Sequence, residues 1–294
     1  MKHKFFVVGG DLRSGKLAHM LYEDANKVFV LGLDGLDEID ENFGIEKVNS
    51  VRDGIDKCEV VIAPTPFSKD GVDVFAPFSK KKILVEDLLR DSKGKTFVAG
   101  AIEDSLKQDL EEKYDRVYDL MKREELTILN TIATAEGTIE VAIKHTDEIL
   151  QGARVLVLGF GRVAKIVANK FSMNSCFVTC AARKTTDLAW IQAYGYKAIN
   201  INDMVYDLKN FDIIINTVPQ KILGINELKH VSKDVLLIDL ASSPGGIDGD
   251  TAKNMGLKFV WALALPGKVA PKTTAGFIKN VIYNILSDMS KDVE

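Results

Sequence analysis

The sequence has 294 residues, a hydrophobic content of 46%, a charged content of 27% and a formal net charge of −4. This composition is ordinary for a folded globular protein of one or two domains, and the acidic balance argues against nucleic acid as a main partner. The three cysteines include no CxxC pair, which predicts a cytoplasmic protein without a disulfide framework. The four histidines are scattered, so no metal site is expected. No apolar run is long enough to span a bilayer, so no membrane partner is expected.

The N-terminal third alternates apolar runs with helical stretches. Strands are expected at residues 4–8, 27–31, 59–63, 82–85 and 96–99. A helix over 16–22 follows the first of them, and strands separated by helices are typical of parallel βαβ units. The first turn, at Gly9 and Gly10, lacks the GxGxxG pattern. We therefore predict a Rossmann-like domain that binds no nucleotide.

A long stretch without proline follows at about residues 120–150. Its apolar residues recur at helical spacing, and Gly152 closes it. This pattern predicts one connector helix that leads directly into the next domain.

The segment 154–168 carries the most informative motif. An apolar strand is followed by a turn and a helical pattern, with the turn formed by Gly159, Phe160, Gly161, Arg162, Val163 and Ala164. Strand, glycine-rich turn and helix in this order are typical of dinucleotide-binding domains. Gly159 permits a tight turn, Gly161 leaves room for a pyrophosphate, and Ala164 lets the helix pack closely on the strand. The helix N-terminus supplies N–H donors for the phosphates.

The second strand of this domain, residues 176–182, ends in Arg183 and Lys184. An NAD-binding domain would place an acidic residue there for the ribose 2′-hydroxyl, and Asp187 comes several residues too late. A cationic pair suits a 2′-phosphate, which a carboxylate would repel. We therefore expect NADP(H), with NAD(H) or a merely solvated basic loop as the alternatives.

Three more strands are expected, at 212–216, 235–239 and 258–261, before an amphipathic C-terminal helix. The whole pattern predicts an α/β fold with two Rossmann-like doubly wound domains, a long connector helix between them and a cleft between the domains. The expected boundaries are 1–125 with the C-terminal helix 277–294 for a substrate domain, and 126–276 for the NAD(P)-binding domain with its connector helix.

Ligands of open α/β sheets bind beyond the carboxyl ends of the strands. The loop after 212–216 is expected to touch the cofactor through Asn216, Thr217, Val218 and Pro219, unless it is a simple turn. Asp239 ends the next strand and either contacts the cofactor or caps its own turn. Ser242 and Ser243 follow it with hydroxyls and small neighbours that suit close approach by a flat ring.

Anion-holding groups are expected in two further places. Lys268, Lys272 and Thr273 precede the last helix and can present cations and a hydroxyl, the alternative being surface lysines beside an N-cap threonine. Arg13 follows the first strand and can hold a carboxylate bidentately, or is a surface arginine. Thr65 lies in a proline-rich loop at the same edge.

No residue stands out as the proton acceptor. Glu136 and His145 on the connector and His19 on the first helix qualify by residue type. Each suits a structural role better, so the general base stays unassigned.

Several segments together resemble the family of dipicolinate synthase A subunits of spore-forming bacteria. The resemblance extends over the whole chain and is carried by residues 9–13, 64–66, 134–137, 157–162, 237–246 and 265–272. The turn at 159–162 alone would equally fit adenosylhomocysteinase-like and shikimate-dehydrogenase-like proteins.

The resemblance implies oxidation of dihydrodipicolinate, a small cyclic dicarboxylate, to dipicolinate with NAD(P)⁺ as hydride acceptor. It also implies a role in the mother cell during sporulation, on a branch of lysine biosynthesis, with the flavoprotein-like B subunit of dipicolinate synthase as partner. We further expect a homo-oligomer. Two alternatives stay open: a non-catalytic nucleotide-binding partner of the flavoprotein-like chain, and a dehydrogenase for another small acid of the shikimate- or alanine-dehydrogenase type.

Overall fold

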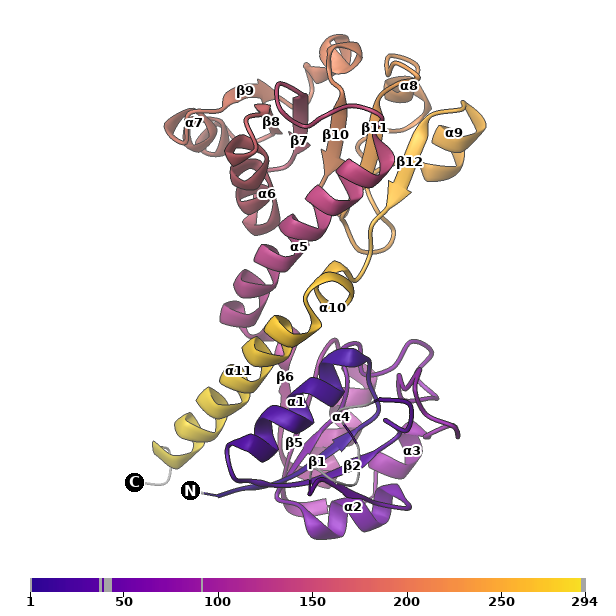
Figure 1. Cartoon of the computed structure of the whole chain (residues 1–294), viewed down its shortest axis with the longest axis vertical. Helices are drawn as coiled ribbons and strands as arrows, with labels where there is room; N and C mark the ends of the chain where they lie inside the picture. The colour runs from indigo at the N-terminus through magenta and orange to yellow at the C-terminus, as the bar shows by residue number, and fades with distance from the viewer. Residues whose placement is uncertain (1, 37–38, 40–43, 91, 292–294) are drawn as a thin grey trace. The chain divides into compact units, whose positions relative to one another are not determined.

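The structure is a computed structural model that describes residues 2–36, 39, 44–90 and 92–291. The chain divides into two compact units (Figure 1). Unit 1 comprises Met1–Leu129 and Ala270–Glu294, and unit 2 comprises Asn130–Val269.

In the described part of unit 1, the strands form one parallel sheet and are β1 (Lys4–Val8), β2 (Lys27–Leu31), β3 (Glu46–Lys47), β4 (Val60–Ile62), β5 (Ser92–Ala99) and β6 (Tyr114–Asp119). Their order in the sheet is β3-β2-β1-β4-β5-β6. The helices are α1 (Leu12–Glu23), α2 (Val51–Lys57), α3 (Val85–Leu88), α4 (Asp104–Lys113), η3 (Leu120–Lys122) and α11 (Pro271–Lys291).

Both faces of this sheet are covered, which explains why its central strands are apolar throughout. Successive side chains of a strand point to opposite faces. Phe5 and Val7 accordingly pack with residues of α1 and α11, whereas Phe6 and Val8 pack with residues of α2, α3 and α4. The C-terminal helix α11 is therefore part of the core of unit 1.

Unit 2 repeats this architecture with β7 (Arg154–Leu158), β8 (Phe177–Ala182), β9 (Lys197–Asn200), β10 (Ile213–Asn216), β11 (Leu236–Asp239) and β12 (Lys258–Trp261). The order β12-β11-β10-β7-β8-β9 is equivalent to that of unit 1. Its helices are α5 (Glu124–His145), α6 (Arg162–Met173), α7 (Thr185–Ala193), η4 (Met204–Asn210), α8 (Ile225–Leu228), α9 (Gly249–Asn254) and α10 (Leu265–Val269). Residues of α5, α6 and α7 cover one face, and those of η4, α8 and α9 cover the other.

The predicted fold class, two Rossmann-like doubly wound units joined by a long helix, is confirmed. Helix α5 begins at Glu124 in unit 1 and continues into unit 2. In each sheet the strand order reverses at one point, between β1 and β4 and between β7 and β10. Such a point separates two neighbouring loops at the carboxyl edge and is where ligands of this fold class bind.

One predicted strand is wrong. Residues 82–85 lie outside the sheet, where Leu84 forms an isolated antiparallel bridge with Asp73 and helix α3 begins at Val85. The backbone of this segment is already paired: Val74 donates to the Ile83 carbonyl, and Val85 donates to the Val72 carbonyl. Ile83 is buried because it packs in a core cluster without joining the sheet.

Two helix boundaries also differ from the prediction. The connector helix ends at His145 and not near 150, because the chain turns at Thr146, whose hydroxyl donates to the Glu148 carbonyl. The last helix begins at Pro271, several residues earlier than expected, and proline is well suited to a first helical turn. The predicted helix extended to 294, and residues 292–294 lie outside the described chain.

Candidate functional site

The turn between β7 and α6 lets a ligand approach its backbone closely. Gly159 has a φ of +95°, and a Cβ there would lie 2.7 Å from Thr217 Oγ1. Only glycine fits this conformation and this contact without strain. Gly161 precedes α6, and a Cβ placed on it would meet no atom within 4 Å. The space beside Gly161 is therefore open to a ligand, while Ala164 is fully buried against the sheet.

The start of α6 has the properties of an anion site. The helix has 12 residues, with no acidic side chain in its first turn and no side-chain cap on its N-terminus. Its first N–H groups and its dipole therefore favour a phosphate next to Gly161. Phe160 is buried and contacts Tyr194, which fixes the turn, while Arg162 is exposed and Val163 half-buried.

The end of β8 presents two cations. Arg183 and Lys184 follow the strand directly, and both side chains are exposed. Within residues 176–186, all of them described, there is no carboxylate that would repel a phosphate. Asp187 lies in the first turn of α7.

The loop after β10 borders the glycine turn. The hydroxyl of Thr217 donates to the Leu158 carbonyl at 2.8 Å, and Val218 lies next to Gly159. Thr217 and Val218 are half-buried and Pro219 is exposed, so these three residues have surface to offer a ligand.

The side chains of Asn216 and Asp239 have no such surface, and their surroundings favour the alternative in which Asp239 holds its own turn. They are 0% and 1% exposed, and Asn216 Nδ2 donates to Asp239 Oδ1 at 2.7 Å. The same carboxylate accepts the backbone N–H groups of Ala241, Gly246 and Ile247. These side chains therefore hold the loops after β10 and β11 in shape. Ser242 and Ser243 stand exposed on the second of these loops.

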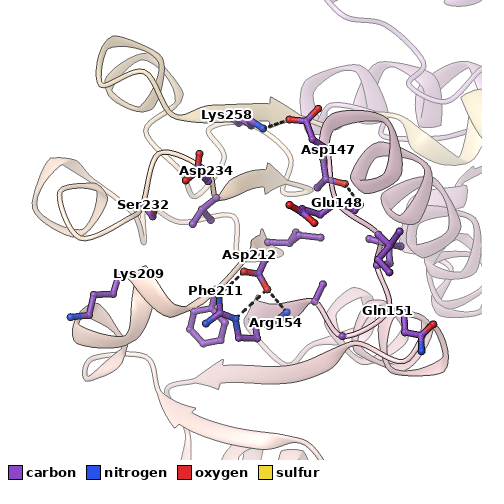
Figure 2. A pocket seen from close by; sticks show the side chains of 17 residues that line it. Asp147, Glu148, Gln151, Arg154, Lys209, Phe211, Asp212, Ser232, Asp234 and Lys258 are labelled. Atoms are coloured by element: carbon purple, nitrogen blue, oxygen red, sulfur yellow. Dashed lines mark hydrogen bonds and ion pairs between the residues drawn. The ribbon is translucent and has the colours of Figure 1, made fainter.

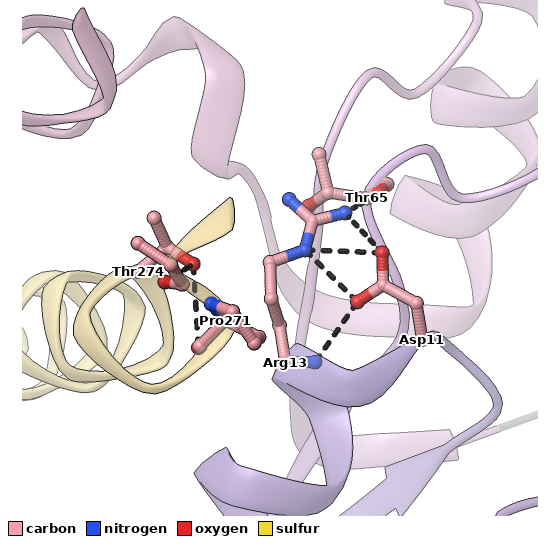
Figure 3. A network of polar contacts seen from close by, with 6 residues as sticks. Asp11, Arg13, Thr65, Pro271 and Thr274 are labelled. Atoms are coloured by element: carbon pink, nitrogen blue, oxygen red, sulfur yellow. Dashed lines mark hydrogen bonds and ion pairs between the residues drawn. The ribbon is translucent and has the colours of Figure 1, made fainter. Parts of the chain in front are cut away.

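Unit 1 has its own polar cluster at the corresponding reversal point (Figure 3). Arg13, in the first turn of α1, forms a two-pronged pair with Asp11, with Nε to Oδ1 at 2.9 Å and Nη2 to Oδ2 at 2.8 Å. Its Nη2 also donates to the Thr65 carbonyl at 2.6 Å. Arg13 therefore joins the loop after β1 to the loop after β4.

This pairing changes the expected role of Arg13. Asp11 already takes the Nε–Nη2 edge of the guanidinium, so Arg13 cannot offer that edge to a substrate carboxylate as well. The sequence interpretation missed Asp11. An aspartate just before a helical stretch is a typical N-cap, and the Asp11 carboxylate does accept the Arg13 backbone N–H at 3.0 Å.

The remaining predicted substrate residues are exposed and lie on two separate helices. Lys268 belongs to α10 in unit 2, whereas Lys272 and Thr273 lie in the first turn of α11 in unit 1. The segment was expected to be one loop and is instead a pair of helices.

The contacts of the three candidate bases are typical of residues with a structural role. Glu136 accepts a hydrogen bond from Lys170 Nζ at 2.7 Å, and His19 lies 3.4 Å from Glu23. His145 is the last residue of α5 and is exposed. None of these observations points to proton transfer.

Unit 2 has a cavity of about 520 Å³, whose lining side chains are drawn in Figure 2. It lies at the amino ends of the strands, whereas the glycine turn follows the carboxyl end of β7. Its walls include Arg154, Ile213 and Lys258, the first residues of three parallel strands. Arg154 pairs with Asp212 at 2.7 Å, and these hydrogen bonds lower the pKa of the Asp212 carboxyl. The dinucleotide fingerprint therefore has no part in this cavity.

The described residues contain neither a membrane-spanning helix nor a metal cluster. No helix in that part of the chain is both long and apolar enough to cross a membrane. Among the same residues, no group of three or more histidine, cysteine, aspartate or glutamate side chains could hold a metal ion.

Two sequence-family models match the chain. The model described as the N-terminal domain of the dipicolinate synthase A subunit matches residues 4–121, and that described as shikimate/quinate 5-dehydrogenase matches residues 140–260. Unit 2 therefore contains a domain of the dehydrogenase type.

Similar proteins cover nearly the full length. The dipicolinate synthase A subunit of Bacillus subtilis (strain 168) is 30% identical over 98% of this chain and 97% of its own. A crystal structure of the A subunit from Bacillus halodurans superposes with a TM-score of 0.87 at 32% identity, covering 97% of both chains. That of the A chain from Bacillus subtilis gives 0.86 at 31% identity, covering 99% of this chain and 98% of the other.

Proposed function

The chain belongs to the family of dipicolinate synthase A subunits, and from this premise we propose that it oxidises dihydrodipicolinate to dipicolinate with NADP⁺ as the hydride acceptor. The observation that carries the proposal is the open turn at Gly161, which precedes an uncapped helix N-terminus in a dehydrogenase-type domain. Family membership agrees with the resemblance found in the sequence.

The residues of unit 2 fit a nicotinamide dinucleotide. The first N–H groups of α6 would bind the pyrophosphate beside Gly161, where no side chain intervenes. Arg183 and Lys184 would pair with a 2′-phosphate, which favours NADP⁺ over NAD⁺. Thr217 and Val218, next to Gly159, would border the bound dinucleotide. The cofactor supplies a hydride acceptor, and the protein's task is to bind and orient it.

On the substrate side, the proposal assigns Arg13 a positioning role. The Asp11 pair and the Thr65 carbonyl lock one edge of the guanidinium, and its remaining Nη1 group would donate to a carboxylate of the ring. Ser242 and Ser243, and the cations Lys268 and Lys272, are further proposed contacts. The reaction removes a hydride and a proton and yields an aromatic pyridine, so precise positioning of the ring is the main requirement.

The family name denotes one of at least two different chains, and it therefore also supports proposals about context. We expect a flavoprotein-like B subunit as partner, a homo-oligomeric A subunit, and expression in the mother cell during sporulation. The proposals of the partner and of the mother cell depend on the family resemblance alone.

The direct test supplies purified protein with NADP⁺ and dihydrodipicolinate, with and without the partner chain. We expect dipicolinate absorbance to rise together with NADPH absorbance, and the Gly161→Asp variant to lose both because its carboxylate would face the phosphates. Exposed Gly35, which has no positive φ and whose added Cβ would make only an ordinary contact of 3.7 Å with Phe78, gives the matched Gly35→Asp control. Absence of dipicolinate with and without the partner would refute the proposal.

One observation favours a second function, that of a non-catalytic nucleotide-binding chain. Glu136 is ion-paired with Lys170, and His145 is the exposed last residue of α5. A chain that only activates its partner needs no general base. In that case Arg13→Met would leave activity of the two-chain complex unchanged, whereas the dehydrogenase proposal expects it to fall.

A further inference from the structure

A second cavity lies in unit 1, where β2 and β3 end. Its volume is about 430 Å³, which is within the range of small-molecule sites. Leu31 and Val48, at the carboxyl ends of the two strands, form part of its wall, and the segment 79–83 forms another part. This is the edge of a doubly wound sheet at which ligands are bound. The cavity is separate from the nucleotide turn, which belongs to unit 2.

The shape of this cavity is fixed by packing. Gly32 has a φ of +76°, and a Cβ there would lie 2.5 Å from Ile83 Cδ1 and 3.4 Å from Ser79 Oγ. Glycine therefore lets the segment 79–83 close onto the end of β2. Ile83 is buried in the core beneath, which anchors the segment. The lysines on this segment are consequently held at the cavity by the fold.

The charge of the cavity is strongly positive for an acidic protein. Among its described lining residues there are five cations and two carboxylates, namely Arg52, Lys80, Lys81, Lys82 and Arg90 against Asp34 and Asp87. Subtracting two from five leaves an excess of three positive charges, whereas the whole chain has a net charge of −4. The concentration of cations is therefore local to this cavity.

Three of these cations already have acidic partners. Arg52 pairs with Asp56 at 3.0 Å, Arg90 pairs with Asp87 at 2.7 Å, and Lys82 pairs with Asp73. The ammonium groups of Lys80 and Lys81 have no acidic partner among the described residues, although the Lys80 backbone N–H donates to Asp34 at 3.3 Å. Two neighbouring ammonium groups at a concave site that form no ion pair with the described residues are a favourable arrangement for an anion.

We propose that this cavity binds a small molecule that carries phosphate groups, as a second anion site of the protein. A phosphate bears more charge than a carboxylate and accepts hydrogen bonds from several lysines and arginines at once. Lysine acts as a compact point charge, which suits a phosphate without demanding the planar geometry of a carboxylate fork. A volume of about 430 Å³ fits a small metabolite.

The test uses inorganic pyrophosphate as the probe in isothermal titration calorimetry of the full-length protein at low ionic strength. Wild-type protein should show two classes of sites, because the Gly161 turn also accepts a pyrophosphate. Gly161→Asp should remove one class, and the pair Lys80→Gln with Lys81→Gln should weaken the other about tenfold or more. This design separates failure of the second site from failure of the nucleotide site.

Two matched pairs control for charge and for folding. Lys27→Gln with Lys93→Gln removes two exposed lysines of unit 1 outside the cavity and should leave both classes intact. Lys80→Arg with Lys81→Arg keeps the charges and should preserve binding. An unchanged isotherm in the Lys80→Gln and Lys81→Gln pair would overturn the proposal. Citrate binding more tightly than pyrophosphate at this site would overturn the assignment to phosphate.

Discussion

Asn216 Nδ2 donates to Asp239 Oδ1 at 2.7 Å, and this bond joins the carboxyl ends of β10 and β11 below the surface. Three backbone N–H groups of the loop after β11 converge on the same carboxylate. The more accessible residues Thr217 and Ser242 therefore owe their positions to two side chains that a ligand does not reach.

Asp239→Asn should destabilise the protein by about 3 kcal/mol. The carboxylate now accepts hydrogen bonds from backbone N–H groups, and an amide NH₂ group in its place would face those donors without accepting from them. Urea unfolding measures this change. Asp250→Asn is the control, since Asp250 is exposed and its substitution should cost no more than about 0.5 kcal/mol. Equal unfolding midpoints for the two variants would contradict the buried network.

Gly159→Ala and Gly161→Ala should have different effects. At Gly159 the positive φ and the contact with Thr217 should cost about 1–3 kcal/mol of stability. At Gly161 the methyl group has free space, so stability should be unchanged while the affinity for NADP⁺ falls. Gly152→Ala, with a φ of +83° and no neighbour within 4 Å, isolates the backbone strain from the contact. Thermal unfolding and cofactor titration distinguish the three variants.

Arg183→Asp should reverse the nucleotide preference. Removing a cation and adding an anion should weaken NADP⁺ binding by about tenfold or more, while NAD⁺ binding changes little, because only NADP⁺ carries the 2′-phosphate. Fluorescence titration with both nucleotides measures the ratio. Lys197→Asp, on exposed Lys197 at the start of β9, is the control. If the ratio stays the same in Arg183→Asp, the basis for preferring NADP⁺ is lost.

Arg13→Lys should lower kcat/KM by about 100-fold, since lysine keeps the charge but cannot hold Asp11, Thr65 and a carboxylate at once. The dissociation constant of NADP⁺ should not change, because Arg13 belongs to the other unit. Arg116→Lys, on β6, is the matched control. Equal loss of NADP⁺ affinity and activity would show that Arg13 acts through the fold.

The three cysteines should resist modification in the native protein. Burial raises the pKa of the Cys58 and Cys180 thiols to about 12 and also raises the pKa of Cys176. At pH 8 a thiol reagent should therefore label none of them quickly, and all three after denaturation. The folded pKa values exceed the unfolded value of about 8.5, so this contribution to stability is complete below that pH and is lost as the pH rises. The double variant Cys58→Ala with Cys180→Ala should show a smaller loss of stability between pH 8 and pH 10.

The central strands of both sheets were predictable from the sequence, whereas of the four edge strands only β12 was. Strands β1 and β7 are buried on both faces, so their residues form apolar runs that identify them. Strands β6 and β9 lie at sheet edges, where half-buried and exposed positions allow the polar sequences that escaped prediction. The run at 82–85 is apolar for another reason, since Ile83 packs beside the sheet without entering it.

The same distinction applies to the candidate site. The turn at Gly159 has a local motif because its glycines are required by local geometry. The partners Asp11 and Thr65 are 54 residues apart, and Arg13 joins them only because β1 and β4 are neighbours in the sheet. Contacts of this kind depend on the topology of the sheet, so they cannot be predicted from the spacing of residues in the sequence.

The position of α11 bears on the order in which this chain can mature during translation. Its residues Ile278, Val281 and Ile282 share a core with Phe5 and Val7, which leave the ribosome before unit 2 is synthesised. Unit 2 is complete once residue 269 has emerged, whereas unit 1 waits for the final helix. The sheet of unit 1 is thus synthesised before that of unit 2 but covered after it, and its apolar face is exposed to chaperones until α11 has emerged.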